Sequence, residues 1–478
     1  MKMLIGGKQV DASDGAKLDV INPGNLSVID TVPMATKDDI LTAITNASNG
    51  FKIWSETPLF QRITILQEFL KLYWKHSDEL VDLLIKEVGK TVRNATLCVR
   101  GRGNFIDECI AQARTLHGEC FAVSNRIGTN GDLVTTIREP VGIVAAIMPF
   151  NYPINMVANK VIPALLMGNA VIAKPASETP LSSIRFCELL LEAGVPGDVI
   201  QIVTGSGSKI GKWLIGDPRV AAVCMTGSTD VGIEIAKIAA DNLTDVHLEL
   251  GGNDPLIVLE GVDMDRVVEE SIAGRTDNTG QVCISIKRFL VQNSIKKEFI
   301  DRLISSLKTK RIGDPSSDPS VDCGPMVSIK AAKDVEEQVE HCINQGAKLL
   351  LGGKRYNESY MEFTVIEATP EMDVSRDLEI FGPVFTIIGF ESIDEAIEIA
   401  NNSKFGLSSG VMGGSMQDMF KVAKKIQCGT CVINGTGRYL SNDQPFGGYK
   451  MSGIGREGVR QSLEAMSQEK TIVIRKVF

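Results

Sequence analysis

One cysteine of this sequence stands in a context that suits a nucleophile. Cys283 ends the run Asn278-Thr-Gly-Gln-Val-Cys283, whose small and amide-bearing residues leave the backbone able to donate to an oxyanion. A cysteine hydrolase would need a histidine base nearby, and the histidines at 76, 117, 247 and 341 lie in no such signature. On these residues alone, a buried structural cysteine remains the favoured alternative.

A carboxylate supplies a different kind of base. Glu249 lies at the end of the apolar run Val246–Leu250 and is followed by Gly251 and Gly252. Glycines after a strand allow a backbone or a cofactor to approach closely. A carboxylate in that place can activate a water molecule.

Two glycine-rich loops could bind phosphate groups. Gly205-Ser-Gly207-Ser-Lys-Ile-Gly211 is one residue longer than the dinucleotide fingerprint, and a plain turn is an equal alternative. Gly227-Ser-Thr-Asp-Val-Gly232 has the spacing of a phosphate loop but lacks the required Lys-Ser/Thr pair. Its place between a strand and a helix still suits a pyrophosphate, and the alternative is a simple helix cap by Ser228 or Thr229.

The remaining cysteines and histidines predict no metal site. Cys428-Gly-Thr-Cys431 leads into the expected strand Thr430–Ile433, whereas a redox C-x-x-C motif should open a helix. No second C-x-x-C completes a zinc ribbon, and the other cysteines are scattered.

The elements that must position these residues alternate between strand and helix, which predicts an α/β fold with parallel sheets and helices on both faces. Residues 1–35 are expected to form short strands and residues 37–117 to be helical. Asn130-Gly131 is a hairpin signal within 119–140, and Lys470–Arg475 is a terminal strand. The buried strands are expected at Ile143–Met148, Ala170–Ala173, Val199–Val203, Ala221–Met225, Val246–Leu250, Leu256–Leu259, Phe289–Val291, Phe385–Gly389, Ser409–Met412 and Thr430–Ile433.

Composition narrows the class of protein. The 478 residues are enough for two or three domains, and 50 basic against 59 acidic residues leave a net charge of −9. That balance argues against nucleic acid or an anionic membrane as a partner. No apolar run is long enough to span a membrane, and Met1–Gly7 does not open a signal peptide, so we expect a cytoplasmic protein.

Taken together, the motifs resemble the aldehyde dehydrogenase superfamily over nearly the whole chain. Each motif is modest by itself, but all occur in the order and at the spacing of that family. They are Pro149-Phe150-Asn151-Tyr152-Pro153, Lys174-Pro-Ala-Ser177, Thr226-Gly-Ser-Thr229, Leu248-Glu-Leu-Gly-Gly252, Gly280-Gln-Val-Cys283, Glu379-Ile-Phe-Gly-Pro383 and Pro445-Phe-Gly-Gly448.

The resemblance implies an oxidation of aldehydes to carboxylic acids with NAD or NADP. Cys283 would attack the aldehyde and form a thiohemiacetal and then a thioester, which Glu249 would hydrolyse by activating water. The side chain of Asn151 and the N–H of Cys283 would hold the oxyanion. The cofactor residues carried over are Met148, Pro149, Phe150, Lys174, Ser177, Glu178, Gly207, Gly211, Thr226, Gly227, Ser228, Leu250, Glu379 and Phe381.

Within this resemblance, Lys174 would touch the adenosine ribose and Ser228 the pyrophosphate, while Glu379 and Phe381 would hold the nicotinamide ribose and ring. NAD-specific members often have Glu where this chain has Ser177, so NADP becomes acceptable, although Glu178 adds a charge beside it. We therefore expect use of both cofactors.

Two further departures bear on the substrate. Members that oxidise glyceraldehyde 3-phosphate usually have Arg at position 282, and succinate-semialdehyde members usually have Arg at position 277; here these are Val282 and Asp277. A small neutral or hydroxylated aldehyde such as lactaldehyde is therefore expected. Arg438 could still anchor a carboxylate, or be a solvated loop residue. The residues expected at the substrate are Asn151, Ile284, Arg438 and Phe446.

The resulting expectation is a Rossmann-like cofactor domain (1–117 and 141–250), an α/β catalytic domain (251–458) and a small β oligomerisation appendage (118–140 and 459–478). The appendage predicts a homodimer or homotetramer. The alternatives are a succinate-semialdehyde dehydrogenase and a CoA-acylating enzyme, but acylating members generally lack the carboxylate seen here as Glu249. A catalytically silent protein on the same fold would have been expected to lose Cys283 or Asn151.

Overall fold

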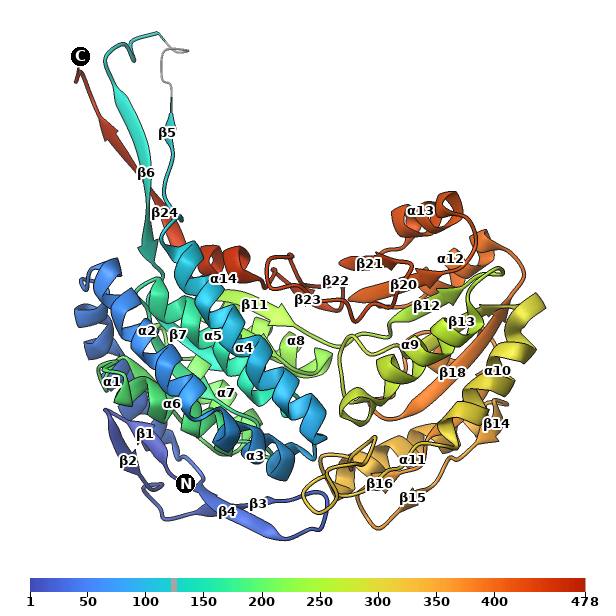
Figure 1. Cartoon of the computed structure of the whole chain (residues 1–478). Helices are drawn as coiled ribbons and strands as arrows, with labels where there is room; N and C mark the ends of the chain where they lie inside the picture. Colours follow the sequence, from blue (N-terminus) through green and yellow to red (C-terminus); the bar gives the residue numbers. More distant parts are fainter. Residues whose placement is uncertain (122–126, 478) are drawn as a thin grey trace.

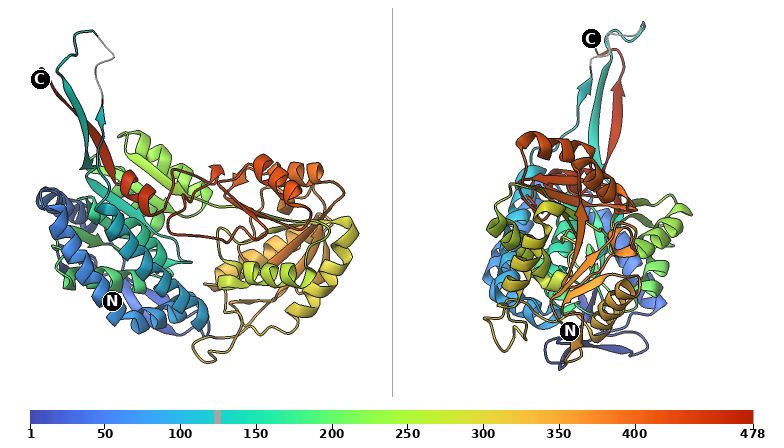
Figure 2. Two further views of the ribbon diagram at one scale, coloured as in Figure 1. Left: turned by 45° about the horizontal axis from the view of Figure 1, so that its top comes forward. Right: turned by 90° about the vertical axis from the view of Figure 1, so that its right-hand side faces the viewer.

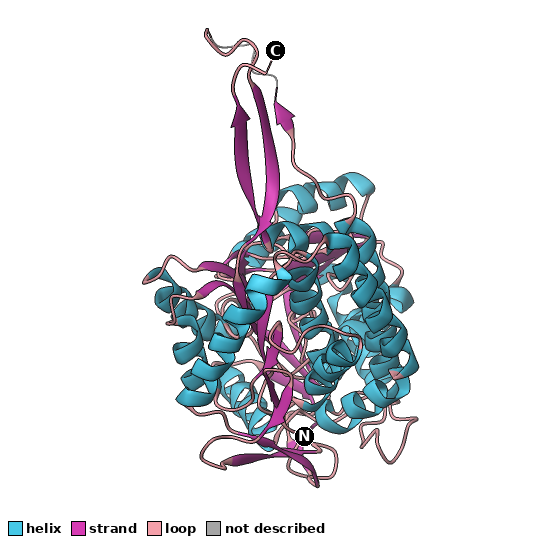
Figure 3. Ribbon diagram, turned by 90° about the vertical axis from the view of Figure 1, so that its left-hand side faces the viewer, coloured by secondary structure: helices cyan, strands magenta, loops and turns pink. Residues whose placement is uncertain are grey.

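The computed structural model describes residues 1–121 and 127–477, and in this part of the chain two helix-covered sheets lie side by side with a narrow arm projecting from one of them (Figure 1). Both sheets are built mainly from parallel strands, so the predicted α/β class is confirmed. Figure 3 shows the helices on both sides of the strands.

The first sheet has eight strands in the order β2-β1-β9-β8-β7-β10-β11-β23, and all five of its predicted strands are present. Its central strands are parallel and apolar on both faces, which is why they could be recognised as continuous hydrophobic runs. Its strands are β1 (Met3–Ile5), β2 (Lys8–Val10), β7 (Ile143–Ile147), β8 (Ala170–Lys174), β9 (Ile200–Ile202), β10 (Val220–Thr226), β11 (Asp245–Glu249) and β23 (Gly453–Ile454).

Alternate residues of these strands enter two different cores. Val144 and Val171 pack against α2 to α6 and α14, whereas Ala145 and Ile172 pack against α1, α7 and α8 on the opposite face. The helices are α1 (Lys37–Trp54), α2 (Leu59–Lys75), α3 (Ser77–Val88), α4 (Val92–Ala113), α5 (Pro153–Leu166), α6 (Leu181–Glu192), α7 (Gly207–Ile215), α8 (Thr229–Ala240) and α14 (Val459–Ala465).

The second sheet has seven strands in the order β14-β17-β18-β13-β12-β20-β21. Its five predicted strands are confirmed, but β14 and β17 were not predicted; they add an edge to the sheet beyond β18. Helices α9 and α10 cover one face and α11, α12 and α13 the other. The bounds are β12 (Pro255–Val258), β13 (Arg288–Gln292), β14 (Lys348–Leu351), β17 (Thr364–Ala368), β18 (Val384–Phe390), β20 (Ser408–Met412), β21 (Thr430–Ile433), α9 (Met264–Thr276), α10 (Asn293–Leu307), α11 (Ile329–Asn344), α12 (Ile393–Asn401) and α13 (Met416–Lys425).

The arm is a three-stranded antiparallel sheet of β5 (Cys120–Phe121), β6 (Leu133–Pro140) and β24 (Ser467–Ile474). It confirms both the hairpin-like segment and the terminal strand expected from the sequence, while residues 122–126 lie outside the described chain. Figures 1 and 2 show that the arm stands away from the body. Consequently, apolar side chains such as Val473 and Ile474 are about half exposed, at 54% and 49%.

The chain passes between the two sheets more than once, and two of these crossing segments lie next to each other. Residues 250–254 lead from β11 into β12, and near the C-terminus β23 returns to pair with β11. The N–H of Leu250 donates to the carbonyl of Ser452 at 2.9 Å, which ties the two crossings together. Helix α14, within the range expected for the appendage, packs Val459 and Leu463 into the core of the first sheet.

None of the described helices combines the length and apolarity that crossing a membrane requires. The remaining elements of the structure are short. The hairpin β3–β4 extends below the first sheet in Figure 1. These elements are β3 (Lys17–Ile21), β4 (Val28–Pro33), β15 (Arg355–Tyr356), β16 (Tyr360–Met361), β19 (Phe405–Gly406), β22 (Tyr449–Lys450), η1 (Asp277–Gly280) and η2 (Asp373–Ser375).

Candidate active site

The loop that carries Cys283 has an unusual backbone. Asn278 and Thr279 adopt positive φ angles of 46° and 59°, which side chains other than glycine rarely accept. The loop is held by hydrogen bonds: Thr279 Oγ1 donates to the Gly324 carbonyl at 3.0 Å and Asn278 Nδ2 to the Asn151 carbonyl at 3.3 Å. Gly280 is also required, because a Cβ there would lie 2.3 Å from the Gly382 oxygen.

Cys283 is partly exposed and packs against a small apolar cluster. The buried members of this cluster are Val282, Ile284 and Leu407, with Tyr152 and Phe446 beside them. Two of the predicted substrate residues, Ile284 and Phe446, therefore lie next to the thiol. Burial raises the pKa of the Cys283 thiol to about 12, and the ammonium of Lys287 opposes that rise.

Asn151 reaches the nucleophile loop from the first sheet. It precedes α5, is 6% exposed, and its Nδ2 donates to the Gln281 carbonyl at 2.9 Å. An amide nitrogen has two hydrogens, so one remains for an oxygen atom bound beside Cys283. The structure thus brings Asn151 and Cys283 together although 132 residues separate them.

Glu249 ends β11 and is almost fully buried. Its Oε2 has no hydrogen-bond partner among the described residues. Burial raises the pKa of Glu249 well above its usual value, Glu457 raises it further, and Lys160 and Arg456 oppose the shift. A cavity of about 20 Å³ beside Glu249, Lys160 and Glu457 is large enough for one water molecule.

The charged neighbours of Glu249, Lys160 and Glu457, were not among the residues predicted from the sequence. Lys160 is 1% exposed, and its Nζ pairs with Glu457 Oε1 at 2.6 Å and donates to Thr226 Oγ1 at 2.8 Å. Although burial alone would raise the pKa of Glu457, Lys160 and Asn159 hold it below its usual value. The signal in the sequence was a single charged residue in helix α5, whose other side chains are apolar apart from Asn155 and Asn159.

The residues carried over for an adenine dinucleotide gather at the carboxyl ends of the first sheet's parallel strands. Lys174 ends β8, and burial lowers the pKa of its ammonium to about 8 while Glu178 opposes this. Ser177 Oγ donates to the Gly205 carbonyl at 3.0 Å, whereas Glu178 is exposed. A Cβ on Gly207, the first residue of α7, would lie 3.5 Å from Lys174 Nζ.

The other cofactor residues have mixed surroundings. Met148 is buried and its N–H donates to the Lys174 carbonyl; Leu250 packs against Gly232 of α8; and the hydroxyl of Thr226 is engaged by Lys160. Pro149 is half-buried in the loop before α5, Gly211 lies inside α7, and Gly227 lies between β10 and α8.

Two observations fit the dinucleotide that the resemblance implies. Ser228 is the N-cap residue of the twelve-residue helix α8, but its side chain makes no capping hydrogen bond. The N–H groups of the first turn can therefore face an anion such as a pyrophosphate. Phe150 and Phe381 come from the two different sheets, and their rings meet edge to face at 6.0 Å.

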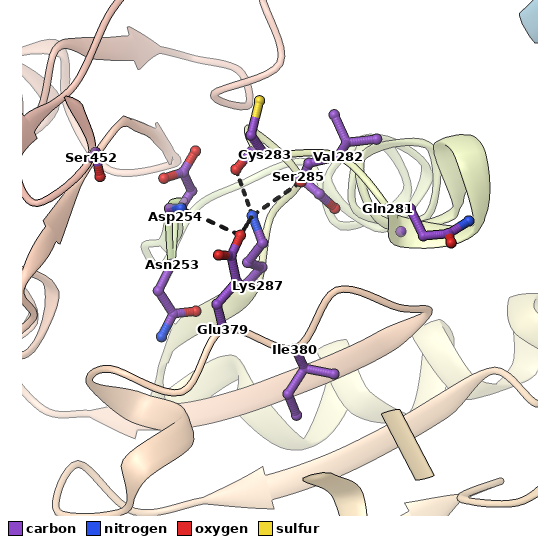
Figure 4. Close-up of polar contacts among 12 residues, drawn as sticks. Asn253, Asp254, Gln281, Val282, Cys283, Ser285, Lys287, Glu379, Ile380 and Ser452 are labelled. Atoms are coloured by element: carbon purple, nitrogen blue, oxygen red, sulfur yellow. Dashed lines mark hydrogen bonds and ion pairs between the residues drawn. The ribbon is translucent and has the colours of Figure 1, made fainter. Parts of the chain in front are cut away.

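Glu379 faces the nucleophile loop (Figure 4). Its Oε1 pairs with Lys287 Nζ at 3.1 Å and accepts from the Gly252 N–H at 3.3 Å. A Cβ on Gly251 would lie 2.5 Å from the other carboxylate oxygen, so a side chain there would require the end of Glu379 to move. The sequence motifs predict Glu379, but none of them includes Lys287.

Arg438 is occupied by a neighbouring carboxylate. Its Nη2 pairs with Asp277 Oδ2 at 2.5 Å and its Nη1 donates to the Ala273 carbonyl at 2.5 Å. Asp277 also accepts from the Tyr152 hydroxyl at 2.9 Å and from Asn94 Nδ2 at 2.7 Å. The charge expected to meet a substrate carboxylate is therefore held within the protein.

The described residues contain no group of His, Cys, Asp and Glu side chains that could hold a metal ion. Cys428 Sγ lies 3.1 Å from Ser409 Oγ and 3.1 Å from the Thr430 carbonyl at the start of β21. That placement on a strand agrees with the sequence argument against a redox helix.

The family model of the aldehyde dehydrogenase family matches residues 10–472. The chain is 35% identical to a 3-sulfolactaldehyde dehydrogenase of Priestia aryabhattai (96% of this chain, 95% of the relative). It is 33% identical to the succinate-semialdehyde dehydrogenase [NADP(+)] of Escherichia coli (98% and 97%) and 34% identical to a lactaldehyde dehydrogenase of Methanocaldococcus jannaschii (99% and 100%).

Solved structures give the same result. The crystal structure of an NAD-dependent aldehyde dehydrogenase from Sinorhizobium meliloti superposes with a TM-score of 0.95 at 36% identity, covering 99% of this chain and 94% of that one. The match therefore extends over both sheets and the arm. The protein belongs to the aldehyde dehydrogenase family and is an NAD(P)-dependent enzyme that oxidises aldehydes.

Proposed function

We propose that this enzyme oxidises a short, neutral, hydroxylated aldehyde such as lactaldehyde to its carboxylic acid. The observation that supports this most is the Asp277–Arg438 ion pair, which neutralises the arginine near the apolar cluster around Cys283. An aldehyde with a carboxylate tail would have to compete with Asp277 for that arginine. A lactaldehyde dehydrogenase among the relatives agrees with the proposal.

In the proposed mechanism, Cys283 loses its thiol proton to solvent, and the thiolate attacks the aldehyde carbon to give the oxyanion of a thiohemiacetal. The free hydrogen of the Asn151 amide and the backbone N–H of Cys283 stabilise the oxyanion, and each such donor is typically worth about 3 kcal/mol of barrier. A nicotinamide held by Glu379 and Phe381 would supply the hydride acceptor for the substrate carbon. Glu249 then takes a proton from water, and the water releases the acid from the Cys283 thioester.

Glu249 must be deprotonated for that last step. Lys160 and Arg456 favour the carboxylate form, whereas burial and Glu457 favour the acid. The unpartnered Oε2 is the atom that we expect to accept the proton of the attacking water.

For the cofactor, we propose use of both NAD and NADP. The ammonium of Lys174 suits a 2′-phosphate, Ser177 carries no charge that would repel one, and the carboxylate of Glu178 is exposed on the neighbouring residue. The cofactor domain would comprise 1–117 and 141–250 and the catalytic domain 251–458. The arm would join copies of the chain into a homodimer or homotetramer in the cytoplasm.

The test is kcat/KM over a set of aldehydes: lactaldehyde, glyceraldehyde, succinic semialdehyde and 3-sulfolactaldehyde, each with NAD and NADP. We expect the neutral hydroxyaldehydes to be preferred. A preference for succinic semialdehyde or for the sulfonate would overturn the proposal. Formation of an acyl-CoA in the presence of coenzyme A, rather than free acid, would establish the acylating alternative.

The variant Asp277→Asn tests the supporting observation directly. Freeing Arg438 offers a substrate carboxylate a charged hydrogen bond worth about 1.5–3 kcal/mol, or roughly a 10- to 100-fold gain in relative kcat/KM for succinic semialdehyde. Asp265→Asn is the matched control, because that exposed carboxylate pairs with Arg302 on the outside of α9. No gain in Asp277→Asn would show that Arg438 does not face the substrate.

A further inference from the structure

Lys287 is a buried lysine whose three N–H donors are all used. Its side chain is 2% exposed, and its Nζ lies 2.5 Å from the Cys283 carbonyl and 3.1 Å from the Val282 carbonyl. The third acceptor is Glu379 Oε1, also at 3.1 Å. Figure 4 shows these contacts converging on one ammonium group directly beneath the nucleophile loop.

These contacts join two segments that are far apart in the sequence. Cys283 lies in the loop before β13, and Glu379 lies in the segment before β18. Glu379 in turn rests against the turn formed by Gly251 and Gly252, which is separated from Glu249 only by Leu250. One ammonium group therefore fixes the position of the Cys283 loop relative to Glu379, expected at the nicotinamide ribose, and Glu249, expected at the attacking water.

The charges around the thiol give this lysine a second effect. Asp254, Glu379 and Glu249 all act to keep the Cys283 thiol protonated, and Lys287 opposes them. Asp254 is 3% exposed, its Oδ1 accepts from the Ser408 N–H, and its Oδ2 has no partner among the described residues. Of these four charged residues, only Lys287 is positive. Without it, a Cys283 thiolate would have only carboxylates among its charged neighbours in this group.

We propose that Lys287 is a positioning residue that sets the reactivity of Cys283 by holding its loop and by balancing Glu379. The inference rests on the proposed roles of Cys283 and Glu379. It assigns opposite effects to the two partners of the ion pair: the ammonium favours the Cys283 thiolate, and the Glu379 carboxylate disfavours it.

The test is the pH dependence of alkylation of Cys283 by iodoacetamide, measured without aldehyde or cofactor. The modified peptide that contains Cys283 is quantified by mass spectrometry, and the exposed Cys120 serves as an internal reference in the same digest. We expect Lys287→Met to move the Cys283 profile to higher pH by about one unit, which is about tenfold less thiolate at a fixed lower pH. Lys287→Arg keeps the positive charge, so its Cys283 profile should stay close to that of the native enzyme.

Glu379→Gln is the complementary variant, because it leaves Lys287 in place and should move the profile to lower pH. If Lys287→Met does not fold, this variant alone tests whether the Lys287–Glu379 pair sets the reactivity of Cys283. A merely structural role for Lys287 predicts no opposed shifts. An unmoved profile in a folded Lys287→Met protein, or a shift of Glu379→Gln to higher pH, would overturn the proposal. Failure of the proposed function shows separately, as aldehyde turnover that survives Cys283→Ala.

Discussion

Replacing Glu249 by glutamine should separate the two halves of the proposed reaction. Glutamine has nearly the same shape but cannot take a proton from water, so thioester hydrolysis loses its base. In the proposed mechanism, Glu249 takes no part in forming the thioester. We therefore expect a rapid burst of about one NAD(P)H per chain, followed by slow turnover.

The structure sets the size and the pH dependence of this effect. Loss of a general base typically costs about 10²–10⁴ in rate. Burial and Glu457 raise the pKa of Glu249, so in the native enzyme the deprotonated fraction, and with it the steady-state rate, rises as the pH increases through that pKa. Because the glutamine variant has nothing to titrate at this position, its slow rate should lack that rise.

The assay is stopped-flow absorbance of NAD(P)H at several pH values, with Glu260→Gln as the control because that carboxylate is exposed at the end of β12. An unchanged steady-state rate in Glu249→Gln would refute the assignment. Loss of the burst together with the slow rate would show that Glu249 acts before hydrolysis instead.

Three further predictions concern the nucleophile, the cofactor and assembly. Cys283→Ala should abolish oxidation while cofactor binding, followed by calorimetry, persists; an active variant would refute the mechanism. Ser177→Glu should lower kcat/KM with NADP far more than with NAD, since a carboxylate repels the 2′-phosphate, and equal losses would mean that Ser177 does not face the ribose. Sedimentation should find a dimer or larger at micromolar concentration, because β24 leaves its edge and Val473 exposed, and a monomer of 51.7 kDa would contradict this.

Much of the fold could be predicted because parallel strands that are covered on both faces appear in the sequence as short apolar runs. Strands β14 and β17 were not predicted from the sequence, and the reasons are physical. The strand Lys348–Leu351 begins with a lysine and lies, partly exposed, at the sheet edge, and Thr364–Ala368 carries a glutamate in its five residues, so each strand contains a charged residue. Strand β17 joins the sheet by pairing with β18 and β14 by pairing with β17, and both pairings are tertiary contacts.

The site was predictable where chemistry and local motif coincide, and not where the partners are distant. Cys283, Asn151 and Glu249 each stand in a recognisable local context. The pairs Lys160–Glu457 and Lys287–Glu379 join residues 297 and 92 positions apart, and no local pattern shows which lysine pairs with which carboxylate. Only the folded chain reveals that burial forces each ammonium group to find a carboxylate.

The projecting arm has a practical consequence for anyone who tags or immobilises this enzyme. The C-terminal strand runs out to the tip of the arm, whereas the N-terminus lies at the opposite end of the molecule (Figures 1 and 3). A fusion at the N-terminus loses the pair between the Met1 ammonium and Asp30, which is worth less than about 1 kcal/mol at a partly exposed site. A fusion after residue 478 would instead sit beside the free edge of β24. Purification handles and surface linkers therefore belong on the first residue rather than the last.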